Sequence, residues 1–470
     1  MNTKTYIRLT PFFLFYFTLT LLVSDNIFFW DTVQLGSKHA HFFYETNFSQ
    51  LLLPNDIDSG HIPTFGMYLA LAWKIFGKNL LVSHLAMFPF LFGIVIQAFL
   101  LLKKFITEKY IYYALLIFLS DATLLSQSTL ISPDIALVFF FLLGLNAVLS
   151  EKKVILSMSI TGLFLVSMRG MMVAFAILII DIVFNIKRSS IKSILDQLLR
   201  KSFIYLPALL IFIFYNYIHF TQKGWIGYHE DSPWAISFQP VDFKGFLFNI
   251  GLLGWRMIDF GRIFLWVTTC FIGIKYFKAI KHDKKFLRMS FILVILTLTL
   301  SYSFLMYKYL SGHRYILPLY LVFSLITIYL IFEKIQIEKV KYILFTFVLI
   351  GSLTGNFWVY PKKISQGWDA SLAHLNYYKL RNEMMVYMKK EGIKIQDVGC
   401  AFPNITEQKF LDLSNNMDKH PYKNLDTDKY VLYSNVYNEF EDNEIDRLET
   451  KFTLVKEFRQ LGVFIQLYRK

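Results

Sequence analysis

Two aspartates lie shortly after the first long apolar stretch of the chain, and their side chains are the first candidates for chemistry. Asp31 follows the apolar run 28–30, and Asp58 lies in a short polar turn. A carboxylate placed here can take a proton from an incoming hydroxyl or amine, and such a base typically contributes about 10²- to 10⁴-fold in rate. Aspartate is also a good helix cap, so Asp31 could instead cap a helix that begins at Thr32.

Two further polar residues lie at turns that we expect on the same side of a membrane. His61 follows Asp58 in the polar turn and could donate a hydrogen bond to a phosphate or a sugar, although packing and capping are commoner roles for a single histidine. Asp134 follows a Ser-Pro pair, which is a common opening of a helix. A divalent metal is possible through Asp31, Asp58 and Asp134.

Three cationic side chains complete the candidates. Arg169 lies between two short apolar stretches, where a guanidinium needs a phosphate or an acidic partner. His313 and Arg314 precede a late apolar stretch and could neutralise the charge on a leaving phosphate. The alternative for Arg314 is an anchor that meets lipid headgroups at the membrane surface.

The composition places these candidates in a membrane protein. The chain has 470 residues, of which 55% are hydrophobic and 17% are charged, and its mean hydropathy is +0.45. A soluble domain of this length is normally less apolar and more charged. The net charge of +14 does not indicate a nucleic-acid partner, because the basic residues gather in short loops between apolar stretches.

The apolar stretches predict a mainly α-helical bundle of about eleven membrane spans, because about 20 apolar residues are needed to cross a bilayer. The first stretch is interpreted as a retained span, since it is long for a signal peptide and no small-residue cleavage site follows it. The predicted spans are 6–23, 82–102, 109–126, 135–150, 154–168, 171–186, 202–219, 257–276, 287–307, 315–332 and 341–358.

The loops between these spans differ in charge, and the difference predicts an orientation. One set of loops carries roughly twice as many basic residues as the other, and the positive-inside rule assigns the richer set to the cytoplasm. We therefore expect the N-terminus in the cytoplasm and the C-terminus outside it. The basic loops contain Lys103, Lys104, Lys109, Lys152, Lys153, Lys187, Arg188, Lys192, Arg200, Lys201 and the segments 275–288 and 334–341.

Two regions outside the spans have a distinct character. The first outer loop, about residues 24–80, contains the amphipathic stretches 33–44 and 63–76, which we expect to be helices along the outer membrane surface. A re-entrant hairpin is the alternative. Beyond a transmembrane domain of residues 1–358, the polar segment 359–470 predicts a small extracytoplasmic α/β domain. Its predicted elements are a helix at 377–390 and strands at 398–402, 430–434, 452–458 and 463–468.

In their order and spacing, these motifs resemble those of the GT-C superfamily of polytopic glycosyltransferases, and most closely the family that includes protein O-mannosyltransferases and lipid A aminoarabinose transferases. The resemblance covers most of residues 1–330. Many members have Asp-Glu after the first span, whereas Thr32 follows Asp31 here, which leaves open whether Asp31 acts alone or with Asp58. The matching motifs are Trp30-Asp31, Gly60–Phe65, Leu71–Gly77, Ser132–Asp134 and Arg314–Pro318.

The resemblance implies an enzyme of the cell inner membrane with a GT-C-like fold. It would move a sugar, with inversion, from a polyprenyl phosphate to an extracytoplasmic protein, lipid or glycan. Membrane lipids are further expected partners, and no nucleotide cofactor is expected, because the sequence has no glycine-rich phosphate loop. The implied roles are general base for Asp31, second catalytic carboxylate for Asp58, phosphate stabilisation for Arg169, His313 and Arg314, and substrate binding for His61 and Asp134.

Two other classes of function fit parts of the sequence. A transporter or flippase of lipid-linked substrates would explain the spans and the buried charges, but not the surface helices of the first outer loop or a folded outer tail. Transporters also tend to have inverted repeats and broken helices, which the sequence does not indicate. A polymerase or ligase of lipid-linked glycans shares the membrane architecture but not the motifs.

Overall fold

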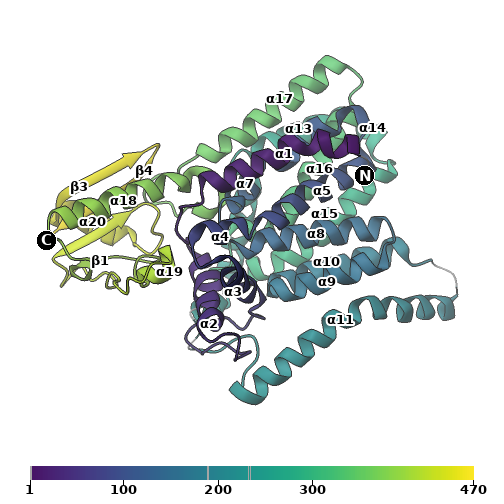
Figure 1. The fold of residues 1–470 in the computed structure, drawn as a ribbon. Coiled ribbons are helices and arrows are strands. Elements are labelled where there is room, and N and C mark those ends of the chain that lie inside the picture. The colour runs from purple at the N-terminus through teal and green to yellow at the C-terminus, as the bar shows by residue number, and fades with distance from the viewer. Residues whose placement is uncertain (1–2, 188–189, 231, 233) are drawn as a thin grey trace.

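A bundle of helices carries the N-terminus, and a smaller α/β unit at one end of the bundle carries the C-terminus (Figure 1). The computed structural model describes residues 3–187, 190–230, 232 and 234–470, and Arg188 of the predicted basic loops lies outside the described residues. Helix α1 (Thr3–Leu22) begins at the end of the bundle far from the α/β unit. This architecture is the fold class that the sequence predicted.

The predicted spans fall on apolar helices. Within the described residues, seven helices are long and apolar enough to cross a membrane, or up to nine if two bent pairs each count as one span. The predicted spans 135–150 and 154–168 fall on shorter apolar helices, α8 and α9. The other helices of the bundle, with the bounds of these two, are α4 (Leu80–Leu85), α5 (Phe88–Phe105), η2 (Glu108–Tyr110), α6 (Ile111–Leu119), α7 (Ala122–Ser128), α8 (Pro133–Leu149), α9 (Lys153–Val166), α10 (Met168–Asn185), α11 (Ile191–Lys223), η3 (Ala235–Phe238), α12 (Phe243–Ile258), α13 (Arg262–Lys275), α14 (Phe277–Ile280), α15 (Lys284–Met306), η4 (His313–Ile316), α16 (Leu317–Tyr329), η5 (Leu330–Lys334), α17 (Glu338–Thr354) and η6 (Gly355–Phe357).

Two predicted spans are not continuous helices. The stretch 109–126 is divided into α6 and α7, which are bent by 71°, and the stretch 257–276 begins at the break between α12 and α13, which are bent by 86°. At the first break the Asp121 side chain accepts hydrogen bonds from two backbone N–H groups of α7. At the second break Gly261 has a φ of +82°, which glycine adopts without strain. Neither stretch contains a proline, so its apolar character alone predicted an unbroken span.

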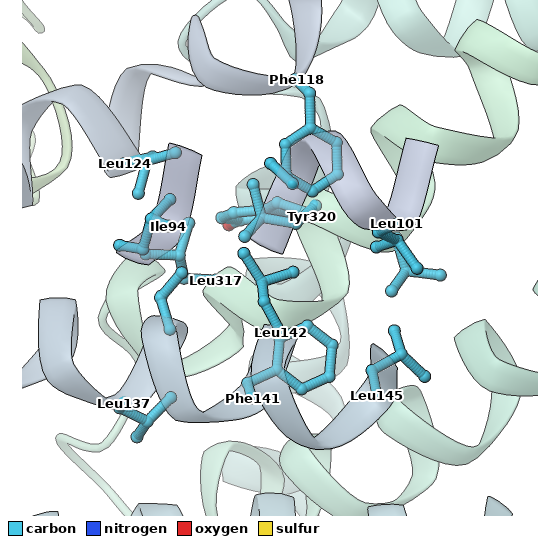
Figure 2. Packing of buried hydrophobic residues seen from close by; sticks show 14 of the residues in the cluster. Ile94, Leu101, Phe118, Leu124, Leu137, Phe141, Leu142, Leu145, Leu317 and Tyr320 are labelled. Carbon is cyan, nitrogen blue, oxygen red and sulfur yellow. The ribbon is translucent and has the colours of Figure 1, made fainter. Parts of the chain in front are cut away.

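Helix α16 runs through the middle of the bundle, and every residue of this helix is buried. Figure 2 shows Leu317 and Tyr320 of α16 among apolar side chains of α5, α6 and α8, such as Phe118 and Leu142. A helix that is apolar on all sides belongs in a protein core. Because Arg314 lies in η4, directly before α16, this packing also fixes the position of Arg314.

The first outer loop contains the two predicted helices. One is the continuous stretch formed by η1 (Val33–Lys38) and α2 (His39–Glu45), and the other is α3 (Thr64–Phe76). They lie against each other so closely that a Cβ atom on Gly66 of α3 would come within 2.3 Å of Cβ of His39. Their position along the membrane surface stays a prediction.

The tail folds as a four-stranded sheet in the order β1-β2-β4-β3, with α18 packed against it. Strands β1 and β2 are parallel, and the other two pairs are antiparallel. The predicted helix and all four strands are confirmed, although β1 is only two residues long, and α19 and α20 were not predicted. The elements from the end of α17 onward are η7 (Trp368–Ala370), η8 (Leu372–His374), α18 (Leu375–Lys390), η9 (Ile395–Asp397), β1 (Val398–Gly399), α19 (Gln408–Asp412), β2 (Tyr430–Ser434), α20 (Asp442–Lys451), β3 (Thr453–Gln460) and β4 (Val463–Arg469).

Candidate active site

The side chain of Arg314 lies at the centre of a cluster of three carboxylates. Its Nη1 donates a hydrogen bond to Oδ2 of Asp369, and its Nη2 donates one to Oδ2 of Asp31. Its Nε lies 3.4 Å from Oδ2 of Asp134. The Arg314 side chain is only 11% exposed, so these charge-assisted contacts are largely shielded from water. The planar guanidinium is thereby held in one orientation.

Arg169 extends this cluster from the start of α10. Its Nη1 donates a 2.5 Å hydrogen bond to Oδ1 of Asp134, so Asp134 bridges the two guanidinium groups. The guanidinium carbon of Arg169 also lies 4.0 Å from the centre of the Tyr315 ring, which is a favourable cation–π distance. The Ser-Pro pair does open a helix, with Ser132 as the N-cap of α8, and the Asp134 carboxylate in the first turn contacts the arginines rather than capping the helix.

Asp31 is held by a tight turn between α1 and η1. Trp30, directly before it, has a φ of +49°, a backbone conformation that a large side chain rarely adopts. The Thr32 hydroxyl accepts a 2.8 Å hydrogen bond from the N–H of Phe29 and donates one of 2.7 Å to its carbonyl. Asp31 does not cap a helix in this structure: Thr32 is the N-cap of η1, and the Asp31 carboxylate binds Arg314.

The electrostatic environment of Asp31 favours its protonated form. Burial raises the pKa of the Asp31 carboxyl above its usual range. Arg314 and Arg169 oppose the shift, while the neighbouring carboxylate of Asp369 adds to it. A carboxylate with a raised pKa is a stronger base than a free aspartate, which is the property that a general base near neutral pH needs.

Asp369 reaches the cluster from the segment that joins α17 to the tail, and the sequence did not point to it. Its carbonyl accepts a 2.8 Å hydrogen bond from Nε2 of Gln127. The carbonyl of the next residue, Ala370, accepts one of 3.2 Å from the Thr123 hydroxyl. Both donors belong to α7, so the break between α6 and α7 places α7 where it can hold η7 and Asp369.

A second network of charges lies directly behind Arg314. His313 is fully buried, and its Nε2 donates hydrogen bonds of 2.9 and 2.8 Å to the two carboxylate oxygens of Asp259. Tyr360 donates to the same carboxylate, and Nη1 of Arg262 lies 3.7 Å from it. Nε2 of His313 is engaged by the Asp259 carboxylate. This contact fixes His313, and therefore helps to hold η4 and the next residue, Arg314, in place.

The other predicted catalytic residue, Asp58, lies in a separate cluster. Its buried carboxylate accepts hydrogen bonds from Nε2 of His219 at 3.1 Å, from Nζ of Lys223 at 2.5 Å and from the N–H of Gly60 at 2.9 Å. Burial raises the pKa of Asp58, but these three hydrogen bonds outweigh burial and hold the pKa below its usual value. These contacts tie the first outer loop to the end of α11.

His61 lies between the two clusters. Its Nδ1 accepts a 3.1 Å hydrogen bond from the N–H of Met168, the residue before Arg169. Burial and the charge of Arg169 lower the pKa of His61 to about 4, so the ring is neutral at pH 7. Since Nδ1 accepts, Nε2 carries the proton and can donate one hydrogen bond to a ligand.

The residues do not fit the divalent metal that the sequence allowed. In the part of the chain that the structure describes, no group of three His, Cys, Asp or Glu side chains is arranged to hold a metal ion. Asp31 and Asp134 both face Arg314, whereas Asp58 is paired with Lys223. The guanidinium of Arg314 therefore lies between the acids of the cluster, where a metal ion would have to bind.

A cavity of about 610 Å³ has none of the five charged residues of this cluster in its lining. It is bounded by the loop that follows α1, by one face of α18 and by β3. Its lining includes Asp25, Ile27, Tyr378, Glu383 and Phe458. The charged side chains of the Arg314 cluster are engaged with one another, so this cavity does not show where a substrate would react.

The comparisons with known proteins concern the fold. No protein-family model matches the chain, and no curated protein matches it. The structure is similar to the crystal structure of ArnT from Cupriavidus metallidurans bound to undecaprenyl phosphate. The chain has an ArnT-like fold. The TM-score is 0.55, the identity is 9%, and the match covers 99% of this chain and 98% of that chain. The predicted fold class, a polytopic helical bundle with a small C-terminal α/β unit, is thereby confirmed.

The sequence identified four of the five charged residues of the cluster, but it missed Asp369. One signal could have found it: Trp368-Asp369 repeats the Trp30-Asp31 pair, and both aspartates bind Arg314. The supporting network was also missed. Asp121 and Arg262 are charges inside predicted spans, and such residues are costly unless they pair.

Proposed function

We propose that the protein is a membrane glycosyltransferase that moves a sugar from a polyprenyl phosphate donor to an extracytoplasmic acceptor. The observation that carries the proposal is the pairing of the Asp31 carboxylate with the Arg314 guanidinium at the tail-facing end of an ArnT-like bundle. Asp31 offers a carboxylate that can act as a base, and Arg314 offers a planar guanidinium that can bind an anion. ArnT, the protein of similar fold, was crystallised with undecaprenyl phosphate, a lipid that carries a phosphate.

The donor phosphate would bind the arginines of the cluster. A guanidinium can donate two parallel hydrogen bonds to phosphate oxygens, and it stays charged at any physiological pH. Arg314 is the central group, and Arg169 lies on the other side of Asp134. His313 holds Arg314 in place through Asp259, which makes it a positioning residue in this proposal. The apolar lipid tail would lie against the helices of the bundle.

In the proposed reaction an acceptor hydroxyl or amine attacks the anomeric carbon of the sugar from the face opposite the phosphate. The new bond to the acceptor forms as the bond between the anomeric carbon and the phosphate oxygen breaks. The phosphate leaves with the bonding electron pair, and the acceptor proton passes to the Asp31 carboxylate, which later releases it to water. Configuration is inverted at the carbon, and the arginines stabilise the negative charge on the leaving phosphate.

Three other predicted residues have subordinate parts in the proposal. Asp134 orients both arginines, and Nε2 of His61 is free to donate a hydrogen bond to the substrate near the start of α10. Asp58, the predicted second catalytic carboxylate, would act through the loop that it fastens to α11. The acceptor would be a protein, a lipid or a glycan.

A transporter of lipid-linked substrates is the second candidate, and one observation favours it. The two bent helix pairs match the broken helices that many transporters have near their binding sites. Here, however, a buried salt bridge between Arg262 and Asp121 joins the two breaks. Because this salt bridge holds the two helix breaks together, we interpret them as fixed parts of the bundle rather than as segments that move during transport.

The test is to measure release of undecaprenyl phosphate from a panel of undecaprenyl phosphate-linked sugars, with glycan, lipid and peptide mixtures as acceptors. Asp31→Asn should lower turnover by about 10²-fold or more, because the amide cannot accept the proton. Asp56→Asn, an exposed acid of the same outer loop, is the matched control and should leave turnover unchanged. A rate for Asp31→Asn within a few-fold of the parent would remove Asp31 from the mechanism. Movement of the intact lipid-linked sugar without transfer would support the transporter.

A further inference from the structure

Both terminal nitrogens of Arg314 are already paired with carboxylates. Nη1 binds Asp369 and Nη2 binds Asp31, while Nε makes no hydrogen bond within the described residues. Free N–H groups remain, since a guanidinium has five, but each terminal nitrogen already carries a carboxylate. A phosphate that approached both terminal nitrogens would lie against these two carboxylates, and the repulsion is relieved if the phosphate takes the place of one of them.

The charge of the cluster leads to the same requirement. Among the described residues, Asp31, Asp134 and Asp369 form ion pairs with two guanidinium groups, those of Arg169 and Arg314. One negative charge is therefore in excess when all three acids are ionised. A bound phosphate would add at least one more in a place that water screens poorly. Binding is therefore favoured when one carboxylate gives up its place beside Arg314.

Asp369 is the acid that is best placed to leave. Asp134 is also bound to Arg169, and Asp31 is fixed by the turn at Trp30, shortly before η1. The Asp369 carboxylate has Arg314 as its only hydrogen-bond or ion-pair partner in the described ranges. Its residue lies on the short η7 helix, outside the bundle helices, in the segment that leads into the tail.

We propose that the Asp369 carboxylate occupies the place on Arg314 that the donor phosphate takes, so that donor binding exchanges one anion for the other and turns the Asp369 side chain out of the cluster. The Asp369 carboxylate thereby gates the donor site. The inference rests on the proposed function, because it assumes that Arg314 holds the donor phosphate. No covalent step is involved, since one anion replaces another on the same guanidinium.

The proposal predicts the sign of a mutational effect. Asp369→Asn removes the competing charge but keeps an oxygen that can accept from Arg314. The affinity for undecaprenyl phosphate should rise by about 10-fold, within the range of roughly 5- to 150-fold that is typical of coupled equilibria. If Asp369 only orients Arg314, the same change should weaken binding or leave it unchanged, since an amide is a poorer partner for a guanidinium.

The experiment measures the dissociation constant of undecaprenyl phosphate for the full-length protein in detergent, with the melting temperature as a check of folding. Asp369→Glu keeps the competing charge and should bind like the parent. Asp426→Asn removes an exposed tail carboxylate that pairs with Arg447, and it should also bind like the parent. Asp369→Ser provides the same test if Asp369→Asn does not fold.

The outcomes separate this inference from the proposed function. Weaker or unchanged binding by the folded Asp369→Asn protein, with clear binding by the parent, overturns the gate and leaves the glycosyltransferase proposal standing. If the parent binds undecaprenyl phosphate and Arg314→Ala does not reduce this binding, both the proposed donor site and the gate are overturned. Tighter binding by Asp369→Asn that Arg314→Ala abolishes supports both.

Discussion

Arg262 and Asp121 join the two points at which apolar helices break. Nε of Arg262 donates to Oδ2 of Asp121 at 2.9 Å, and Nη2 donates to Oδ1 at 2.8 Å, in a fully buried two-bond arrangement. Nη2 also donates to the hydroxyl of Thr123, which in turn donates to the carbonyl of Ala370 beside Asp369. The break between α6 and α7, the break between α12 and α13 and the segment that carries Asp369 are thereby connected.

Loss of Arg262 should therefore destabilise the protein. Arg262→Met leaves the Asp121 carboxylate buried without its partner, and breaking a buried pair in this way typically costs about 3–5 kcal/mol. The double change Arg262→Met with Asp121→Leu should recover much of the loss, because no unpaired charge remains. The measurement is thermal unfolding in detergent. The control is Arg447→Met, which breaks an exposed ion pair and should lower the stability by only about 0–1 kcal/mol. A double variant as unstable as the single one would contradict the explanation.

The sequence predicted the elements of the fold well because their signals are local. Apolar length predicted the apolar helices of the bundle, although two of the predicted spans are broken and two fall on shorter helices, and alternating apolar residues predicted the four strands of the tail. The relative positions of distant residues had no such signal. Asp31 and Arg314 are 283 positions apart, and only the shared outer side of the predicted topology suggested that they meet.

The elements that the sequence missed depend on tertiary contacts. Apolar length alone cannot reveal that α6 ends before Asp121, since the break is stabilised by Arg262 from another part of the chain. Asp58 looked equivalent to Asp31 in the sequence, because both are outer acids near helix starts. The two acids differ in their partners. His219 and Lys223, near the end of a predicted span, pair with Asp58, whereas Asp31 pairs with Arg314.

The predicted orientation can be tested with a reporter. The basic loops predict a C-terminus outside the cytoplasm, so a fluorescent protein that matures only in the cytoplasm should be dark when it is fused after Lys470. The control is the same reporter fused after Lys104, which lies in a predicted cytoplasmic loop and should be bright. A bright, membrane-inserted fusion at Lys470 would reverse the assignment of the candidate site to the outer side.

Replacement of Arg314 tests the phosphate site. Arg314→Ala should weaken the binding of undecaprenyl phosphate by roughly 10- to 100-fold, the equivalent of one or two hydrogen bonds to a charged group. Arg314→Lys should restore only part of the affinity, because lysine lacks the planar fork that meets two phosphate oxygens. The melting temperature of each variant controls for folding, since removal of Arg314 also leaves three acids with Arg169 alone. Unchanged affinity would favour the anchor at lipid headgroups.

The raised pKa of Asp31 predicts the acid side of the pH–rate profile. Only the ionised carboxylate can accept the acceptor's proton, so kcat should fall as the pH falls through the pKa of Asp31. Burial sets that pKa above the usual 3.8 of an aspartate, so the loss should begin at a higher pH than for a free carboxyl. The residual rate of Asp31→Asn should lack this limb. A parent profile that stays flat down to the usual range would exclude Asp31 as the titrating base.

The same pKa shift predicts that the candidate base lowers the stability of the protein at neutral pH. Because the pKa of Asp31 is raised in the folded state, the folded protein holds the proton more tightly than the unfolded chain. The contribution of Asp31 to stability is therefore most favourable below the unfolded pKa, and it is lost as the pH rises toward the folded pKa. Asp31→Asn removes this cost, so it should melt at a higher temperature than the parent at pH 7, by an amount that shrinks as the pH is lowered. A lower melting temperature for Asp31→Asn at pH 7 would mean that the ion pair with Arg314 outweighs burial, and that the Asp31 carboxylate is there to hold Arg314 rather than to act as a base.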